Sequence, residues 1–191
     1  MAWERRLHQF AVCSFKITAL RVSCPISSIL SMIYGKLLEQ YTSNKKAYQK
    51  TLKSVKKVSG GQLDEAFHEH HDQVFQEIDC LKCANCCKTI SPIFKNKDIE
   101  RIAKSLKMRP TAFIEEYLYI DQDGDYVLKE TPCAFLGHDN YCGIYEVRPK
   151  ACSEFPHTNH KNMQKHLFLA KKNLEVCPAV VEIVKKINSN I

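Results

Sequence analysis

The chain has 191 residues, of which 45% are hydrophobic and 26% are charged, and its formal net charge is +7. This length suffices for one domain with its own core, and the low content of six Gly and seven Pro excludes a fibrous or low-complexity protein. No run approaches the ~20 apolar residues of a membrane-spanning helix, so the sequence predicts no transmembrane segment.

The positive charge is confined to the first third of the chain. Residues 1–57 hold 11 Lys/Arg against 2 Asp/Glu, whereas residues 58–191 hold 17 against 19. The lysines of residues 36–57 are typical of a solvated helix face, and they also suit a surface for an unknown protein partner. The remainder of the chain is mildly acidic, so the sequence gives no strong nucleic-acid signal.

The first elements divide the chain into three segments. Residues 1–31 have no sustained period, and we expect a poorly ordered or non-native N-terminal extension. Residues 32–79 predict a helical hairpin whose first helix is Lys-rich and ends at Gly60-Gly61. The second helix carries an apolar stripe made of Leu63, Phe67, His70, Val74 and Ile78.

Residues 80–191 are expected to form a cysteine-cluster metal-binding domain. Its pattern predicts an extended piece at 89–94, helices at 97–106 and 111–118, a strand at 126–129, strands and turns at 133–145, and mostly helix at 168–187. We therefore expect a mainly α fold with short extended segments. It is a helix-rich single domain organised around a cysteine-ligated metal centre.

Eight of the ten cysteines lie between residues 80 and 177 and are the candidate metal ligands. They are Cys80, Cys83, Cys86, Cys87, Cys133, Cys142, Cys152 and Cys177. A C-x-x-C turn brings two sulfurs to one ion without strain. We place the protein in the cytoplasm, where so dense a pattern indicates metal or redox chemistry more often than disulfides.

Two kinds of centre fit these ligands. The run Cys80-x-x-Cys83-x-x-Cys86 matches the three-thiolate run of bacterial ferredoxins and slightly favours an iron–sulfur cluster, while Zn²⁺ suits the same thiolates. Adjacent Cys86 and Cys87 indicate two neighbouring metals, a bridging thiolate, or one ligand beside a functional thiol. Eight thiolates are the number for two tetrathiolate sites.

The cysteine pattern also resembles a known family. Cys80-x-x-Cys83-x-x-Cys86-Cys87, followed by Cys142-x-Ile-Tyr145-x-x-Arg148-Pro-x-x-Cys152, is similar to the YkgJ-type cysteine-cluster family (CxxCxxCC), described as zinc- or iron-chelating. The resemblance implies a metal or iron–sulfur centre and no settled reaction. The family often has Gly and Arg where this chain has Ala84 and Ser153.

Other residues are secondary candidates. Arg148 is predicted to bind near the cofactor, by donating to its sulfurs or to a carboxylate, and Tyr145 to shield it from water. His138 and His157 are candidates to complete a Cys/His ligand set. The segment Phe67–Asp72 only loosely resembles a zinc-binding helix and is interpreted as helix surface. Cys13 and Cys24 are interpreted as incidental.

The sequence therefore favours a metal-binding protein with one or two iron–sulfur or related tetrathiolate centres and a redox role. A structural zinc domain is the first alternative. An accessory or modifying enzyme of unknown substrate is the second, although no glycine-rich nucleotide loop supports it. No catalytic residue is predicted. If the protein is an enzyme, the cysteine pattern indicates at most an iron–sulfur oxidoreductase.

Overall fold

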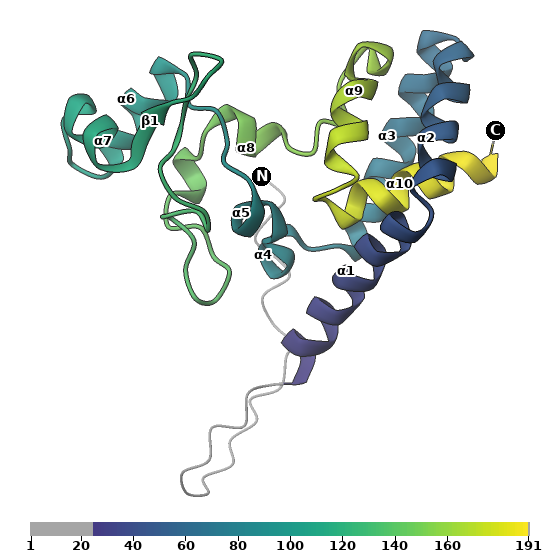
Figure 1. The fold of residues 1–191 in the computed structure, drawn as a ribbon, viewed down its shortest axis with the longest axis horizontal. Coiled ribbons are helices and arrows are strands. Elements are labelled where there is room, and N and C mark those ends of the chain that lie inside the picture. Colours follow the sequence, from purple (N-terminus) through teal and green to yellow (C-terminus); the bar gives the residue numbers. More distant parts are fainter. Residues whose placement is uncertain (1–24, 191) are drawn as a thin grey trace, which may run out of the picture.

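The computed structural model describes residues 25–190 (Figure 1). Most of the expected extension at 1–31 lies outside these residues, as do Cys13 and Cys24. The last part of that segment is helical, because helix α1 spans Pro25–Ser43. Proline suits the first turn of a helix, where its missing N–H has no partner to lose.

The predicted Lys-rich helix is divided at Asn44. Helix α1 ends there, and α2 (Lys45–Ser54) continues into a short 3₁₀ turn, η1 (Val55–Lys57). Tyr48, Thr51 and Leu52 form the buried face of α2, whereas its lysines are exposed. The second predicted helix is α3 (Gly60–Glu77), with Leu63, Phe67, His70 and Val74 buried as the stripe predicts.

Helices from both ends of the described chain share the larger hydrophobic core. Helix α10 (Pro178–Asn190) packs against α1, α2 and α3, and α9 (Met163–Asn173) packs against α3. Val180, Ile183 and Ile187 of α10 are almost fully buried in this core. The core thus cuts across the segment boundary expected at residue 79, because α3 finds its main apolar partners in the C-terminal helices and not in the preceding helix.

A smaller core lies in the middle of the chain. Helices α6 (Asn96–Ser105) and α7 (Pro110–Tyr117) cover strands β1 (Leu118–Ile120) and β2 (Tyr126–Leu128), which pair antiparallel with Leu118 opposite Leu128. The strands are joined by a turn in which the Asp121 carboxylate accepts the N–H groups of Asp123 and Asp125. The Asp121 carboxylate therefore stabilises the turn of this hairpin.

The two cores form two lobes that lie side by side (Figure 1). Between them lie the short helices α4 (Cys80–Cys83), α5 (Asn85–Thr89) and α8 (Lys150–Glu154). A 3₁₀ turn, η2 (Tyr145–Val147), precedes α8. The helix-rich single domain predicted from the sequence is confirmed, and its cysteine-bearing segments lie where the two lobes meet.

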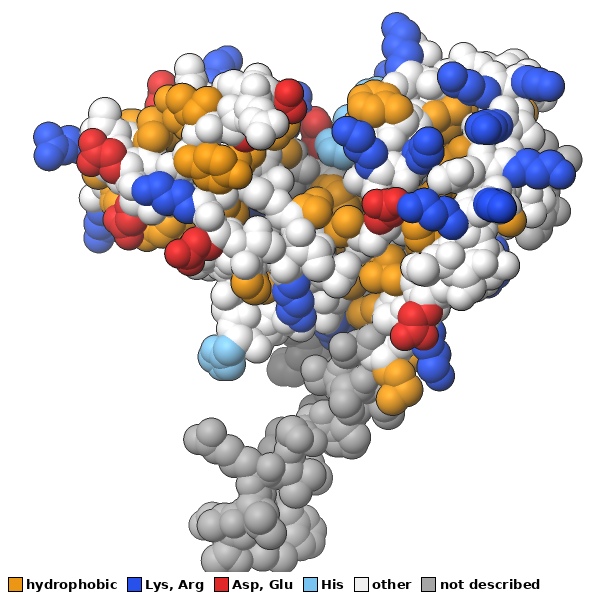
Figure 2. Space-filling view, in the orientation of Figure 1, with side chains coloured by type: hydrophobic (Ala, Val, Ile, Leu, Met, Phe, Trp, Pro, Cys, Tyr) orange, Lys and Arg blue, Asp and Glu red, His pale blue; other side chains and the backbone are white. Residues whose placement is uncertain are grey.

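The faces of the two lobes differ in charge. Lys and Arg side chains crowd the lobe built on α2, α3, α9 and α10, whereas acidic and basic side chains alternate on the other lobe (Figure 2). Within residues 25–190, no helix combines the length and apolar character that crossing a membrane requires.

Candidate metal centre

Four of the cysteines lie on α4 and α5, which are separated by one sharp bend. The Asp79 carboxylate accepts the Leu81 N–H at 2.9 Å and caps the start of α4. The backbone then turns at Ala84, whose φ of 48° lies in the left-handed region. This turn ends α4, begins α5 and reverses the chain between Cys83 and Cys86.

Cys87, Cys133, Cys142 and Cys152 form a group whose thiols influence one another electrostatically in every pair. In each pair, the charge of one thiolate raises the pKa of another. The Cys133 N–H donates to the Cys87 carbonyl at 2.8 Å, which joins the segment after β2 to α5. Cys142 lies opposite Leu136 in an isolated antiparallel bridge. Three separate segments thus converge on Cys87.

Cys80, Cys83 and Cys177 form a second group with the same mutual influence on their thiol pKa values. The Asn85 side-chain amide donates to the Val176 carbonyl at 2.7 Å and holds the chain just before Cys177 against α5. Cys86 lies beside the first group, with its sulfur 3.9 Å from that of Cys87. The Cys87 thiolate also raises the pKa of Cys80 and Cys83 in the second group, so the adjacent pair stands where the two groups meet.

Backbone amides are directed at several sulfurs. Cys83 accepts from the N–H of Asn85, Cys133 from that of Phe135, Cys142 from that of Ile144, and Cys177 from that of Ala179. These donors lie two residues after the cysteine, and at Cys133 and Cys177 the amides of Leu136 and Val180, three residues after it, lower the pKa as well. Because an N–H bond to sulfur favours the thiolate, these contacts lower the thiol pKa and orient the sulfur, as they do around metal–thiolate centres.

Burial and repulsion between thiolates nevertheless raise the thiol pKa values by more than these amides lower them. Desolvation raises the pKa of Cys152 to about 12 and that of Cys177 to about 12, with neighbouring thiolates adding to both shifts. Cys80 is exposed as a residue, yet desolvation of its thiol, with Cys83 and Asp79 beside it, raises its pKa to about 11. A hydrogen bond with Cys86 is the largest cause of the raised pKa of Cys87. Such a set of thiolates needs a cation to offset its charge.

The sulfurs lie in one region of the molecule, but they do not converge on a single metal position. Across residues 25–190, no three cysteine sulfurs lie within 4.8 Å of one another. Sulfurs on one tetrahedral zinc ion, with bonds of about 2.3 Å, lie about 3.8 Å apart. The donor set fits thiolate-bound metal in number and type, and ligation requires side-chain rotations that bring the sulfurs closer together.

Arg148 and Tyr145, the two predicted cofactor-side residues, lie against each other. The Arg148 guanidinium stacks over the Tyr145 ring at 3.8 Å from its centroid, and its Nη1 donates to the Tyr145 carbonyl at 2.6 Å. The positive charge of Arg148 also lowers the thiol pKa of Cys80, Cys142 and Cys152. Arg148 therefore faces both cysteine groups.

A basic cavity opens beside Arg148. Its volume is about 670 Å³, and its lining includes the cationic side chains of Lys95, Lys97, Arg101, Arg148 and Lys150. The carboxylates of Asp98 and Glu146 are the acidic groups of this lining. Asp98 is buried and accepts from Arg101 at 2.7 Å and from the Lys150 N–H at 3.2 Å, so it holds α6 against the start of α8.

The histidine candidates lie apart from the thiols. His138 is exposed, and His157 lies with Glu154 and His160 instead of completing a Cys/His set. Burial, with nearby His160 and His166, lowers the pKa of His157. The segment Phe67–Asp72, predicted to be helix surface, also makes contacts within the molecule. Its His68 and His71 hydrogen-bond to the loop that carries His157 and His160.

The comparison with protein families agrees with this geometry. The model of the CxxCxxCC family, described as a "putative zinc- or iron-chelating domain", matches residues 79–177. This chain belongs to the CxxCxxCC family. The match covers just over half of the chain and all eight clustered cysteines, which supports metal binding as the sequence predicted. No curated protein and no solved structure matches the chain.

Sequence reasoning missed several residues that this CxxCxxCC domain uses. The Asn85 amide reaches Val176 and the Asp98 carboxylate reaches Lys150, each more than 50 positions away, so no local pattern could indicate these two contacts. The amide donors carry no side-chain signal at all. Glu154, His157 and His160 have a regular three-residue spacing, which is the one signal that was available.

Proposed function

We propose that this protein holds two neighbouring thiolate-ligated centres, that these are iron–sulfur clusters, and that it takes part in redox chemistry in the cytoplasm. One centre would use Cys87, Cys133, Cys142 and Cys152. The other would use Cys80, Cys83 and Cys177, with Cys86 as the fourth ligand. The ferredoxin-like run of Cys80, Cys83 and Cys86 favours iron–sulfur over zinc.

The observation that carries the proposal is the division of the thiols into two groups that meet at one adjacent pair. Cys86 and Cys87 are too close in sequence to serve one ion with equal ease. The Cys87 thiolate raises the pKa of Cys80 and Cys83 in one group and that of Cys152 in the other, so the pair lies within reach of both centres. Backbone amides directed at sulfurs support metal-bound thiolates, because an N–H donor stabilises negatively charged sulfur.

A bound cluster would supply one-electron chemistry, and this chain's own residues would tune it. The amides at Cys83, Cys133, Cys142 and Cys177 donate toward negative sulfur, and Arg148 adds a positive charge facing both groups. Both effects stabilise the more negative, reduced state, and so raise the reduction potential. Tyr145 holds the Arg148 guanidinium in place by stacking.

Metal analysis of anaerobically prepared protein tests this proposal. We expect iron and acid-labile sulfide, with a sulfur-to-iron charge-transfer absorption that bleaches on reduction. The Cys87→Ser variant should lose much of the iron, whereas Cys13→Ser, outside the family match, should keep all of it. A colourless protein that contains zinc and no iron would overturn the iron–sulfur assignment.

A structural zinc centre is the second candidate, and the position of the cysteines between the two lobes favours it. Zinc there would join the two cores and contribute directly to folding. Zinc that is tightly bound, together with loss of the fold on chelation, would support this function. Chelation that removes the metal and leaves the fold unchanged would exclude it.

We also propose that the exposed lysines of α2 bind an acidic protein partner. Lys46, Lys50 and Lys53 lie on the exposed face of this helix, whereas Lys45 pairs with Glu175 at 2.6 Å. Binding through such a face weakens as salt is added, because screening shortens the range of its charges. A K46E/K50E variant should lose binding, and salt-independent binding would contradict the proposal.

A further inference from the structure

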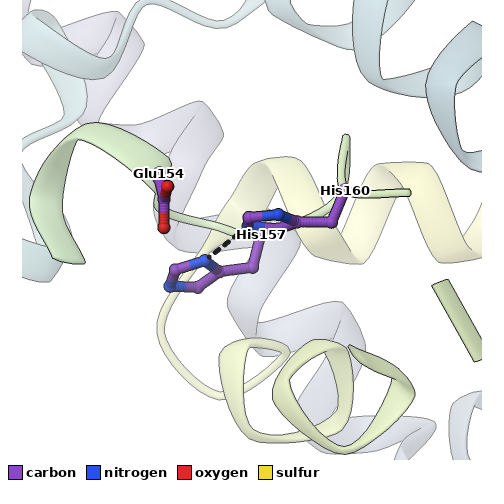
Figure 3. A group of neighbouring side chains, drawn as sticks. All are labelled: Glu154, His157 and His160. Carbon is purple, nitrogen blue, oxygen red and sulfur yellow. Dashed lines mark hydrogen bonds between the residues drawn. The ribbon is translucent and has the colours of Figure 1, made fainter. Parts of the chain in front are cut away.

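A second group of metal-ligating side chains lies outside the cysteine cluster. Glu154, at the end of α8, and His157 and His160, in the loop before α9, bring one ligand atom each within 4.8 Å of the others (Figure 3). His157 Nδ1 and His160 Nε2 are 3.0 Å apart. Within the described chain, these three residues are the group whose donor atoms lie close enough together to hold one metal ion.

The loop that presents these residues is held firmly. His68 Nε2 contacts the His160 carbonyl at 3.0 Å, and His71 Nδ1 contacts the hydroxyl of fully buried Thr158 at 2.8 Å. His157 has a φ of 64°, a left-handed conformation that costs a non-glycine residue energy. Such strain persists where the surroundings impose it, and it is found often at functional sites.

The spacing of the two imidazole nitrogens fits a shared ion. Nitrogens bound to one ion at about 2.0–2.1 Å lie roughly 2.9–3.4 Å apart in octahedral or tetrahedral geometry. The observed separation of 3.0 Å falls in this range. Without an ion the same contact is a hydrogen bond that uses one proton, and Glu154 has a partner in Lys150 at 3.4 Å.

His166 adds an independent observation. Its ring stacks on that of His160 with 4.7 Å between centroids, and its Nδ1 is buried without a hydrogen-bond partner in the described chain. Buried polar nitrogens are nearly always satisfied, so the unpartnered Nδ1 on a ring stacked against His160 adds a polar group that a ligand near this loop would satisfy.

We propose that Glu154, His157 and His160 bind a divalent first-row transition-metal ion, such as Zn²⁺ or Co²⁺, at a site chemically distinct from the cysteines. Two imidazoles and one carboxylate suit ions of this class, whereas the thiolates select softer chemistry. Three protein ligands leave at least one position for water or a small ligand, as in catalytic zinc sites. The site begins two residues after Cys152 on the same short helix.

Cobalt titration of the protein with its cysteine metal already in place tests the proposal. We expect one further equivalent of Co²⁺ to bind and to give weak ligand-field bands without sulfur-to-cobalt charge transfer. The Glu154→Gln variant should weaken this binding at least tenfold, and His160→Ala should do the same. His138→Ala, which changes an exposed histidine elsewhere, is the matched control and should bind normally.

Three results would overturn the proposal. They are the absence of a further Co²⁺ equivalent, charge-transfer bands that place the ion on sulfur, and unchanged affinity in both E154Q and H160A. Thermal unfolding of each variant verifies its fold, and E154Q keeps the test valid if H160A does not fold. The outcome is separate from the cysteine proposal, because a zinc-loaded or iron-loaded cluster serves equally as the starting state.

Discussion

Ala84 is the residue at which the cysteine-bearing segment takes its left-handed turn. Ala84→Gly removes a strain of about 1–2 kcal/mol, but it also loses a buried methyl group of about 0.8 kcal/mol and adds freedom to the unfolded chain. Because these effects offset, we expect a change within about 1 kcal/mol. Ala84→Val, β-branched at a positive φ, should instead lose at least about 2 kcal/mol.

Denaturant unfolding of the two variants compares them directly. Ala84 is 3% exposed, so the added methyl groups of valine have no solvent to enter. Equal stability of the glycine and valine variants would contradict the left-handed conformation at this position.

Asp98 is a buried carboxylate that serves three donors on two segments. It accepts from the Lys95 N–H, the Arg101 guanidinium and the Lys150 N–H. We expect Asp98→Ala to lower the free energy of unfolding by about 2–3 kcal/mol, because two amides and a cation lose their acceptor. Glu100→Ala, an exposed carboxylate on the same helix, is the control and should change stability little. Similar losses in both would contradict the role of Asp98.

At the scale of elements, Asp64 joins α3 to the start of α9. Its carboxylate accepts the N–H groups of Asn162 and Met163 at 2.7 Å each, and these bonds outweigh desolvation and lower the pKa of Asp64. Asp64→Ala should cost about 1 kcal/mol at neutral pH. A lowered folded pKa gives stability that is present above the unfolded pKa and lost as pH falls through the folded value.

The stability difference between the wild type and the Asp64→Ala variant should therefore shrink as the pH falls below about 4. Urea unfolding at neutral and acidic pH measures it. Glu65→Ala, exposed on the same helix, should show no such pH-dependent difference. A difference for Asp64→Ala that is constant across this pH range would exclude the carboxylate as the acceptor.

The elements differ in how far the sequence predicts them. The stripe of α3 is regular, so its buried face follows from periodicity, and the cysteine spacing alone picks out the eight candidate ligands within the family match. The break at Asn44 was not predicted, because no Gly or Pro marks it. The three donors of the His157 loop were missed as a group because their spacing suits a helix, whereas the left-handed His157 lies in irregular backbone.

At the scale of the whole molecule, two cores meet at the cysteines and share few apolar contacts of their own. We expect the metal-loaded protein to unfold in one transition. After chelation under reducing conditions the two lobes should unfold separately, because the proposed metal centres would be their principal link. Scanning calorimetry would show two transitions. A chelated protein that still unfolds in one transition, at an unchanged temperature, would contradict this prediction. The Cys87→Ser variant treated with the same chelator is the control.

The contact of Asn85 with Val176 has a consequence for the unfolded chain. It lies across the base of a long excursion that leaves the larger core near Cys83 and returns to it at α9, just before Cys177. A metal ion shared by these two cysteines would act as a clip on a loop of roughly 90 residues, a closure worth about 4–5 kcal/mol in chain-entropy terms. That amount rivals the whole stability of a small domain, and it depends on no contact inside the excursion. Apart from its own cysteines, the intervening lobe can therefore change its sequence and packing widely while this anchorage stays the same.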